Sequence, residues 1–342
     1  MYCKKRYFQI ISCLFFLCFF SCKDVEDKKI VCWGDSLTAP SGGRGIRGTL
    51  NAIVKGKAYP ELLQSLLGDE YSVINAGVGG ENTLSIMARQ GASPMVLSHD
   101  VTLYKTEEID FEHFIGSRDI PAFKSLYYCG LVTPLLQKGW EESSPAKVNP
   151  CYIEGHKCLL KSDSKFWKEE GKYVFEYNYF IECLDVMEKT ATLPAGSVIE
   201  TYAMRELRGV YANIFFMGQN GGFSTVKELI KQYKEMIAYS QCDKYIIISF
   251  HKPNLVLPDI QSLMEMEDSL LQSFGNHYIN LREYMVKDGL NDAGLKPTQE
   301  DEDSILKGQV PPQLLSDNVH FTAKGKELIA KLVNRKIKEL GY

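Results

Sequence analysis

Apolar strand-like runs alternate with helical runs in two separate stretches of the chain, before residue 93 and after residue 208. The expected strands are 29–33, 71–75, 211–217, 244–250 and 278–281. The expected helices are 59–67, 81–89, 224–239, 260–274 and 322–340. Because a helix is the usual connection between successive parallel strands, this order predicts one α/β domain, built from residues 29–92 and 209–342.

A different pattern occupies residues 93–208, where aromatic and β-branched runs are separated by turn residues. The strands expected there are 101–104, 125–129, 151–160, 173–183 and 197–202. Little helical periodicity is present, so the segment is predicted to be a β-rich domain inserted into the α/β domain. Its length is sufficient to bury a small core of its own.

Cys151 and Cys158 flank a predicted hairpin turn at Glu154-Gly155, and they would face each other across its strands. A disulfide between them is left open, because a directly opposed, hydrogen-bonded pair holds its Cβ atoms too far apart for easy closure. With His156 they could make three metal ligands, but a hairpin explains these residues better. No zinc-type motif with paired cysteines or histidines occurs, so we expect no metal and no cofactor.

The first 21 residues have the features of a signal peptide, because a basic segment at 4–6 precedes an apolar stretch at 7–20. Ser21 followed by Cys22 resembles a lipobox, which predicts that Cys22 is lipid-modified and becomes the mature N-terminus. Ordinary cleavage and an uncleaved anchor are the alternatives. Residues 22–28 are a charged tether, which also resembles the export signals of surface lipoproteins. We therefore expect attachment to the outer membrane, on its periplasmic or its outer side.

Composition narrows the choice of partners. The net charge of the 342-residue chain is −4, so no strong basic field indicates binding to nucleic acid. Beyond the signal segment, no apolar run reaches the roughly 18 residues that suggest a membrane span. The expected contact with the membrane is therefore the lipid on Cys22 alone.

Four clusters of polar residues and glycines each follow an expected strand or precede an expected helix. They are residues 34–38, 75–83, 218–222 and 317–320. In an open parallel sheet, such positions meet in the crevice beyond the carboxyl ends of the strands. Each cluster alone is better explained by a turn or a helix cap. The four together predict a site at that edge of the sheet.

The first and last clusters hold the residues of a nucleophile and its base. Ser36 follows the first strand, and a serine hydroxyl becomes an effective nucleophile only when a base takes its proton. His320 can be that base, because imidazole titrates near neutral pH. Asp317, three residues earlier, can hold the imidazole by its Nδ1–H while Nε2 faces the serine.

Taken in order, the four clusters resemble the sequence blocks of the SGNH (GDSL) hydrolases, over roughly residues 28–92 and 206–342. The resemblance implies a three-layer, flavodoxin-like parallel sheet with Ser36, Asp317 and His320 as the catalytic triad. It also implies an oxyanion hole formed by the amides of Ser36 and Gly80 and the side chain of Asn220. The family usually has Asp after that asparagine, whereas this chain has Gly221. That Asp is not normally a catalytic group, so the difference concerns how well the loop is ordered and not the chemistry.

The sequence thus predicts an extracytoplasmic hydrolase of carboxylic esters, and the first expectation for its substrate is an acetylated glycan. Two alternatives stay open. One is a lysophospholipase or thioesterase with the same chemistry, and the other is a glycan-binding surface lipoprotein without activity. No G-x-S-x-G motif surrounds any serine, which argues against the α/β-hydrolase fold. A glycine-rich stretch at 43–48 does not directly follow a strand, so it does not indicate a dinucleotide site.

Overall fold

The computed structural model describes residues 28–39, 57–97, 99–103, 148–169, 172–183, 185 and 190–342. Cys22, the signal segment, the stretch at 43–48 and the expected strand at 125–129 lie outside the described residues. Within the described part, no helix combines the length and the apolar character needed to cross a membrane.

Five parallel strands form the central sheet, in the order β11-β10-β9-β1-β2. The strands are β1 (Lys28–Gly34), β2 (Tyr71–Gly77), β9 (Ala212–Phe216), β10 (Tyr245–Ile248) and β11 (Tyr278–Ile279). The predicted α/β class is confirmed, and the strand order is compatible with a flavodoxin-like fold. The order reverses between β1 and β9, and ligands of such sheets bind at this kind of switch point.

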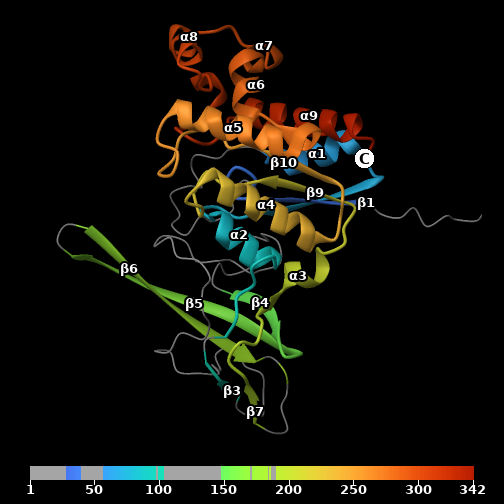
Figure 1. Cartoon of the computed structure of the whole chain (residues 1–342), viewed down its shortest axis with the longest axis vertical. Helices are drawn as coiled ribbons and strands as arrows, with labels where there is room; N and C mark the ends of the chain where they lie inside the picture. Colours follow the sequence, from blue (N-terminus) through green and yellow to red (C-terminus); the bar gives the residue numbers. More distant parts are fainter. Residues whose placement is uncertain are drawn as a thin grey trace, which may run out of the picture.

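Helices cover both faces of this sheet, as Figure 1 shows. Successive residues of β1 point to opposite faces, so Ile30 and Cys32 belong to one apolar core and Val31 and Trp33 to the other. The first core includes α1 (Tyr59–Leu67) and α9 (Ala323–Glu339). The second includes α2 (Thr83–Gln90), α4 (Val226–Ser240) and α5 (Ile260–Phe274). The near-continuous apolar strands of the sequence follow from this burial on both faces.

Side-chain caps begin most of these helices. Asn82, Thr225 and Thr322 each accept a hydrogen bond from an amide in the first turn of the helix that follows. The predicted boundaries therefore shift by one or two residues at most starts. Short elements that the periodicity did not indicate follow α5. They are η2 (Gly275–His277), α6 (Leu281–Lys287), α7 (Gly289–Asp292), α8 (Gln299–Leu306) and η3 (Pro312–Leu314).

The segment between α2 and α3 (Tyr202–Glu206) contains six strands and no helix within its described residues. A two-stranded antiparallel sheet pairs β3 (Val101–Leu103) with β7 (Ala191–Leu193). A four-stranded antiparallel sheet has the order β6-β5-β4-β8. Its strands are β4 (Val148–Ile153), β5 (His156–Glu169), β6 (Lys172–Cys183) and β8 (Glu200–Thr201). The strands are drawn on one side of the helix-covered sheet (Figure 1), and the domain limits at 93 and 208 stay a prediction.

The hairpin predicted at Glu154-Gly155 joins β4 to β5. Both turn residues have positive φ, 48° and 82°, as a two-residue hairpin turn with the twist of the strands requires. Cys151 lies opposite Cys158, and both are thiols in this structure. Ile153 and His156, which flank the two-residue turn, form a hydrogen-bonded pair, and the pair type alternates along the strands. Cys151 and Cys158, two steps further along, are therefore also a hydrogen-bonded pair, the geometry that disfavours a disulfide.

Candidate active site

The loops that follow β1, β2 and β9 meet at the carboxyl edge of the sheet, beside the switch point. The Val78 amide donates to the Gly34 carbonyl at 2.9 Å, which ties the loop after β2 to the end of β1. The Thr83 amide donates to the Gly221 carbonyl at 3.1 Å, which ties the start of α2 to the loop after β9. Three of the four sequence clusters are therefore joined by backbone hydrogen bonds.

Ser36 lies in a tight turn directly after β1. The carbonyl of Asp35 accepts hydrogen bonds from the amides of Thr38 and Ala39, at 3.0 and 2.9 Å, and these bonds close the turn. A Cβ on Gly34 would lie 2.2 Å from Thr38 Oγ1 and 2.5 Å from the Phe216 carbonyl oxygen, so only glycine fits there. The turn leaves Ser36 partly exposed, although both of its neighbours are buried.

The hydroxyl of Ser36 lies in a line of hydrogen bonds with His320 and Asp317. Ser36 Oγ is 2.9 Å from His320 Nε2, and His320 Nδ1 is 2.7 Å from Asp317 Oδ2. The two parts of the chain that supply these groups are 284 residues apart. The structure thus brings together the three residues that the sequence singled out, in the spatial order that a nucleophile, a base and an orienting acid require.

Asp317 is held as a carboxylate. Partial burial would raise its pKa, but the amides of His320 and Val319 donate to it and outweigh that effect, so the pKa is lowered. An ionised carboxylate only accepts hydrogen bonds, so Nδ1 of His320 must carry the proton between them. In a neutral imidazole, Nε2 then has the lone pair that can accept the Ser36 proton. The aspartate thereby selects the tautomer that a general base needs.

Two backbone amides in the loops are available to an incoming ligand. Gly80 lies in the turn between Val78 and Glu81 with a φ of +83°, a conformation that favours glycine. Within the described chain, neither the Ser36 amide nor the Gly80 amide donates a hydrogen bond. Both are members of the predicted oxyanion hole, whose role stays a prediction.

Asn220, the third predicted member, is exposed and already makes two contacts. Its Nδ2 donates to the Glu81 carbonyl at 2.9 Å and lies 3.4 Å from Asp35 Oδ2. The first bond fixes the carboxamide over the loop that carries Gly80. The second is long and therefore weak, so a substrate oxygen could replace it.

Two glycines follow Asn220 in the loop after β9. Gly221 and Gly222 have φ values of +73° and +91°. A Cβ on Gly222 would lie 2.7 Å from Thr83 Oγ1 and 2.8 Å from the Thr83 amide nitrogen. The loop after β9 thus packs directly onto the start of α2, and its order comes from close backbone approach.

A buried ion pair beneath the site was not indicated by the sequence. Arg89 Nη2 lies 2.9 Å from Glu81 Oε2 and 2.8 Å from the Ala76 carbonyl oxygen. The Arg89 guanidinium also lies over the Trp33 ring, 5.4 Å from its centroid. Both charged side chains are almost fully buried. Glu81 immediately follows Gly80, so this pair anchors the turn that presents the Gly80 amide.

Asp35, the residue before Ser36, is a second feature that the sequence did not reveal, because a turn explains an aspartate at this position equally well. Its side chain is fully buried beside the nucleophile. Burial raises the pKa of this carboxyl to about 7, helped by the nearby Glu81 carboxylate and opposed by a hydrogen bond from the Leu37 amide. The carboxyl therefore changes charge near neutral pH, next to the proposed reacting groups.

We expect Asp35→Asn to change how stability depends on pH. The ordinary pKa of the carboxyl is 3.8 and the folded value is about 7, so the folded state binds more protons between these values. The free energy of unfolding of the wild type should then fall as pH rises through that window. Between about pH 4 and pH 8, the free energy of unfolding of the wild type should fall by roughly 3–4 kcal/mol more than that of Asp35→Asn. Urea unfolding at about pH 4 and pH 8 measures it, and an equal difference at both pH values would contradict it.

His251 lies at the end of β10, close to the candidate site. It is buried, and its ring lies 4.5 Å from that of Phe321. Burial lowers its pKa to about 3, helped by the nearby positive charge of Lys252, so the imidazole is neutral. Together with Asp317 it lines a cavity of about 380 Å³.

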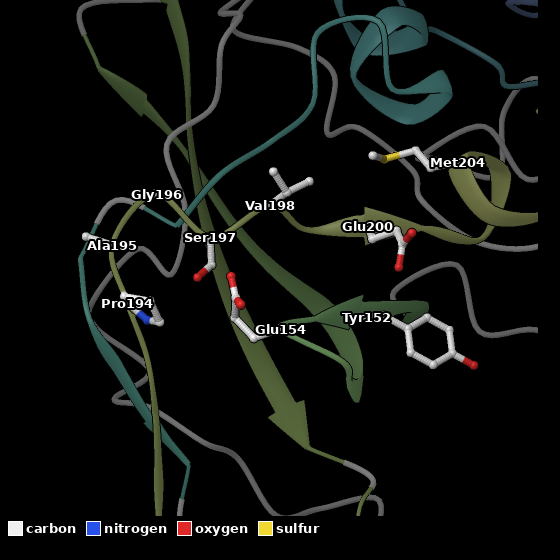
Figure 2. A pocket seen from close by; sticks show the side chains of 9 residues that line it. All are labelled: Tyr152, Glu154, Pro194, Ala195, Gly196, Ser197, Val198, Glu200 and Met204. Atoms are coloured by element: carbon white, nitrogen blue, oxygen red, sulfur yellow. The ribbon is translucent and has the colours of Figure 1, made fainter. Parts of the chain in front are cut away.

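A larger cavity, of about 470 Å³, lies in the antiparallel part of the chain. Figure 2 shows its lining. The ring of Tyr152 comes from β4, the carboxylate of Glu154 from the hairpin turn, and the carboxylate of Glu200 from β8. The Arg205 guanidinium lies 3.7 Å from the centroid of the Tyr152 ring and covers one of its faces. The lining thus combines two carboxylates with apolar residues such as Pro194 and Val198.

Comparisons with known proteins add little to this geometry. No protein-family model matches the chain, and no curated protein matches it. The structure is similar to the crystal structure of a carbohydrate acetylesterase family member from Sinorhizobium meliloti, with 12% sequence identity and a TM-score of 0.36. The match covers 92% of this chain and 100% of that chain.

Proposed function

We propose that this protein is a serine hydrolase acting on carboxylic esters. The single observation that carries the proposal is the line of hydrogen bonds from Ser36 Oγ to His320 Nε2, at 2.9 Å, and from His320 Nδ1 to Asp317, at 2.7 Å. A serine and a histidine without a shared function would have no reason to form this line of hydrogen bonds at the sheet edge. The partly exposed hydroxyl is also open to a substrate.

In the proposed reaction, the Ser36 oxygen attacks the ester carbonyl carbon while His320 Nε2 accepts the hydroxyl proton. The carbonyl oxygen becomes an oxyanion, which the amides of Ser36 and Gly80 and the Asn220 carboxamide would stabilise. The tetrahedral intermediate collapses to an acyl-enzyme, and His320 returns its proton to the departing alcohol. A water molecule then repeats the sequence, releasing the carboxylic acid and restoring Ser36.

An acetylated glycan is the substrate that we propose first, outside the cytoplasm. The proposal follows from the predicted signal segment and from the family resemblance of the four clusters. Purified protein should be tested on p-nitrophenyl esters of increasing acyl length and on acetylated oligosaccharides. Faster turnover of acetyl than of longer esters, with release of acetate from the oligosaccharide, would support it. A preference for long acyl chains would favour a lysophospholipase or thioesterase instead.

Asn220→Ala is expected to be a milder change than loss of the nucleophile or the base. Removing one donor to an oxyanion typically lowers kcat by about 10²–10³-fold with little change in substrate binding. Steady-state kinetics on p-nitrophenyl acetate measures this. Gln219→Ala, in the same loop, is the matched control and should keep most activity. If Asn220→Ala kept the wild-type kcat, its carboxamide would only order the Glu81 loop.

The proposed membrane anchor at Cys22 is tested by metabolic labelling with a fatty acid. The wild type should incorporate the label, and Cys22→Ser should not. Two or more acyl chains suffice for stable attachment to a membrane. After cell fractionation, the wild type should therefore be in the membrane fraction and the variant in the soluble fraction. Equal labelling of both proteins would remove the anchor from the proposal.

A further inference from the structure

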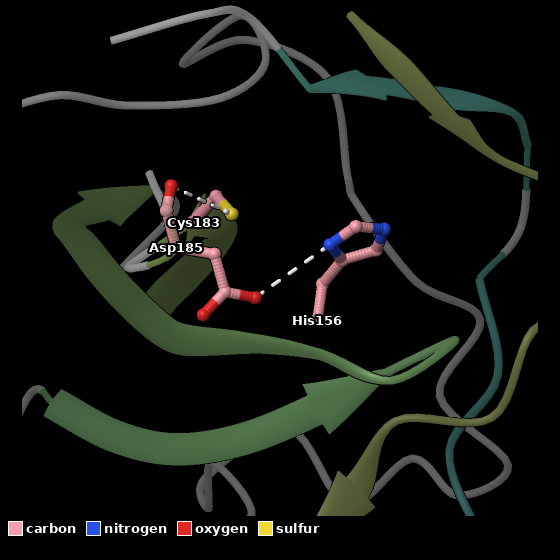
Figure 3. A group of neighbouring side chains, drawn as sticks. All are labelled: His156, Cys183 and Asp185. Carbon is pink, nitrogen blue, oxygen red and sulfur yellow. Dashed lines mark hydrogen bonds and ion pairs between the residues drawn. The ribbon is translucent and has the colours of Figure 1, made fainter. Parts of the chain in front are cut away.

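Three side chains of metal-binding type meet at the end of the four-stranded antiparallel sheet. They are His156 at the start of β5, Cys183 at the end of β6, and Asp185 just beyond it, shown in Figure 3. One ligand atom from each lies within 4.8 Å of the others. We propose that these three residues bind a divalent transition-metal ion of the zinc type, and that the ion ties the hairpin to the end of β6.

The pairing of the strands places these residues on one face of the sheet. Cys158 of β5 lies directly opposite Cys183 of β6. His156 is two residues before Cys158 in β5, so it lies on the same face of the sheet as the cysteines. Beyond the end of β6, Asp185 lies next to it, with Oδ2 3.6 Å from His156 Nδ1. The site is thus a consequence of register, which no local spacing in the sequence reveals.

The separation of the His156 and Asp185 ligand atoms suits two ligands of one ion as well as a long ion pair. His156 Nδ1 lies 3.6 Å from Asp185 Oδ2, too far for a hydrogen bond. Two ligands at about 2.0–2.2 Å from one tetrahedral zinc ion lie about 3.3–3.6 Å apart. Figure 3 shows the Asp185 carboxylate directed toward the His156 ring, with the Cys183 thiol beside them. The pair is therefore held at the separation of co-ligands.

Neighbouring groups orient the proposed ligands. The Lys157 amide donates to Asp185 Oδ2 at 2.8 Å, which fixes the carboxylate next to the histidine. Cys183 is buried in the core of the antiparallel part, whereas His156 and Asp185 are half-exposed at its rim. An ion entering from solvent would therefore meet the imidazole and carboxylate first and the thiol last. Orientation of ligands by such partners is typical of metal sites.

The fourth ligand of a tetrahedral ion would be either a water molecule or the Cys158 thiol. Cys158 is within hydrogen-bonding reach of Cys183, and the charge of Asp185 acts on it. Sulfur, nitrogen and carboxylate oxygen together favour zinc over magnesium or calcium, which prefer oxygen ligands alone. The ligand set therefore defines the chemical class of the ion.

Binding must release a proton. The ion takes the Cys183 sulfur as a thiolate, and the thiol proton leaves to solvent, while His156 binds through Nδ1 and keeps its proton on Nε2.

Oxidation is the chemistry that competes with this site. Cys151 and Cys158 form the hydrogen-bonded type of pair, so on its other side Cys158 forms the closer, non-hydrogen-bonded type with Cys183. That arrangement brings the two sulfurs near enough for a disulfide, which would consume a metal ligand. Reduced and oxidised protein must therefore be separated in the test.

The test is titration of the reduced full-length protein, purified in detergent, with cobalt(II) chloride as a spectroscopic substitute for zinc. We expect about one ion per chain, with a thiolate-to-cobalt charge-transfer absorption and the d–d bands of tetrahedral cobalt. Added zinc should displace both signals and raise the midpoint of thermal unfolding. Cys183→Ser should lose the charge-transfer band, and His156→Ala should lose stoichiometric binding. Cys242→Ser, a thiol outside the cluster, should behave as the wild type.

Three results would overturn the proposal. The first is reduced wild type that binds no cobalt, and the second is an unchanged charge-transfer band in Cys183→Ser. The third is mass spectrometry showing that the protein isolated from cells carries a disulfide between Cys158 and Cys183. If Cys183→Ser does not fold, His156→Ala and Asp185→Asn decide the question. Both of these side chains are half-exposed, so replacing them should leave the fold intact. Thermal unfolding of each variant in the absence of metal checks this.

Discussion

Ser36→Ala and His320→Ala should each lower the turnover of p-nitrophenyl acetate by about 10⁴-fold or more, with the fold unchanged. The two residues act as one unit, because the hydroxyl of Ser36 is a nucleophile only when His320 Nε2, 2.9 Å away, takes its proton. The double variant should therefore be little slower than either single variant. Initial rates with each purified protein, corrected for spontaneous hydrolysis, measure the effect.

A matched control separates loss of chemistry from loss of structure. Ser65 is an exposed serine on α1 and belongs to none of the four clusters, so Ser65→Ala should keep wild-type activity. Thermal unfolding of all three variants should differ little from that of the wild type. If Ser36→Ala retained more than a few per cent of the activity, the proposed mechanism would be wrong.

Arg89→Ala should produce the largest loss of stability among the changes considered, about 3–5 kcal/mol in the free energy of unfolding. The substitution leaves the Glu81 carboxylate buried without its guanidinium partner, next to the carboxyl of Asp35. It also removes the hydrogen bond to the Ala76 carbonyl at the end of β2. Urea unfolding at neutral pH measures the change. Activity should fall as well, because Glu81 follows Gly80 and its carbonyl holds Asn220.

An exposed ion pair provides the comparison. Lys331 and Glu327 on α9 are 2.8 Å apart, and about half of each side chain is exposed. Lys331→Ala should cost less than about 1 kcal/mol, because water screens such pairs. Combining Arg89→Met with Glu81→Gln should recover part of the stability that Arg89→Ala loses. A loss within 1 kcal/mol for Arg89→Ala would show that the buried pair does not anchor the turn.

The α/β alternation could be predicted because the inner strands of the central sheet are buried on both faces and each long helix has one apolar face. The helix at 59–67 begins and ends as expected, with Pro60 in its first turn. The short helices α6, α7 and α8 could not be predicted. Four to eight residues do not contain enough apolar repeats to show a helical period, and tertiary packing holds them in place.

The candidate site was only partly accessible to sequence reasoning. Ser36, Asp317 and His320 stand out because they follow a strand or precede a helix in a recognisable order, and the structure brings them into contact. Their catalytic role stays a prediction. Arg89 and Glu81 were missed because their eight-residue separation crosses a turn and a helix start, where no periodicity connects them.

The sequence by itself determined the class of fold, the hairpin at Glu154-Gly155 and the residues with nucleophile chemistry. These are properties of apolar periodicity, turn residues and side-chain type within short windows. Tertiary structure alone decided the contact between Ser36 and His320, the raised pKa of Asp35 and the meeting of His156 with Cys183. Each of these depends on burial or strand register between distant segments, and such energies arise only when the chain has folded.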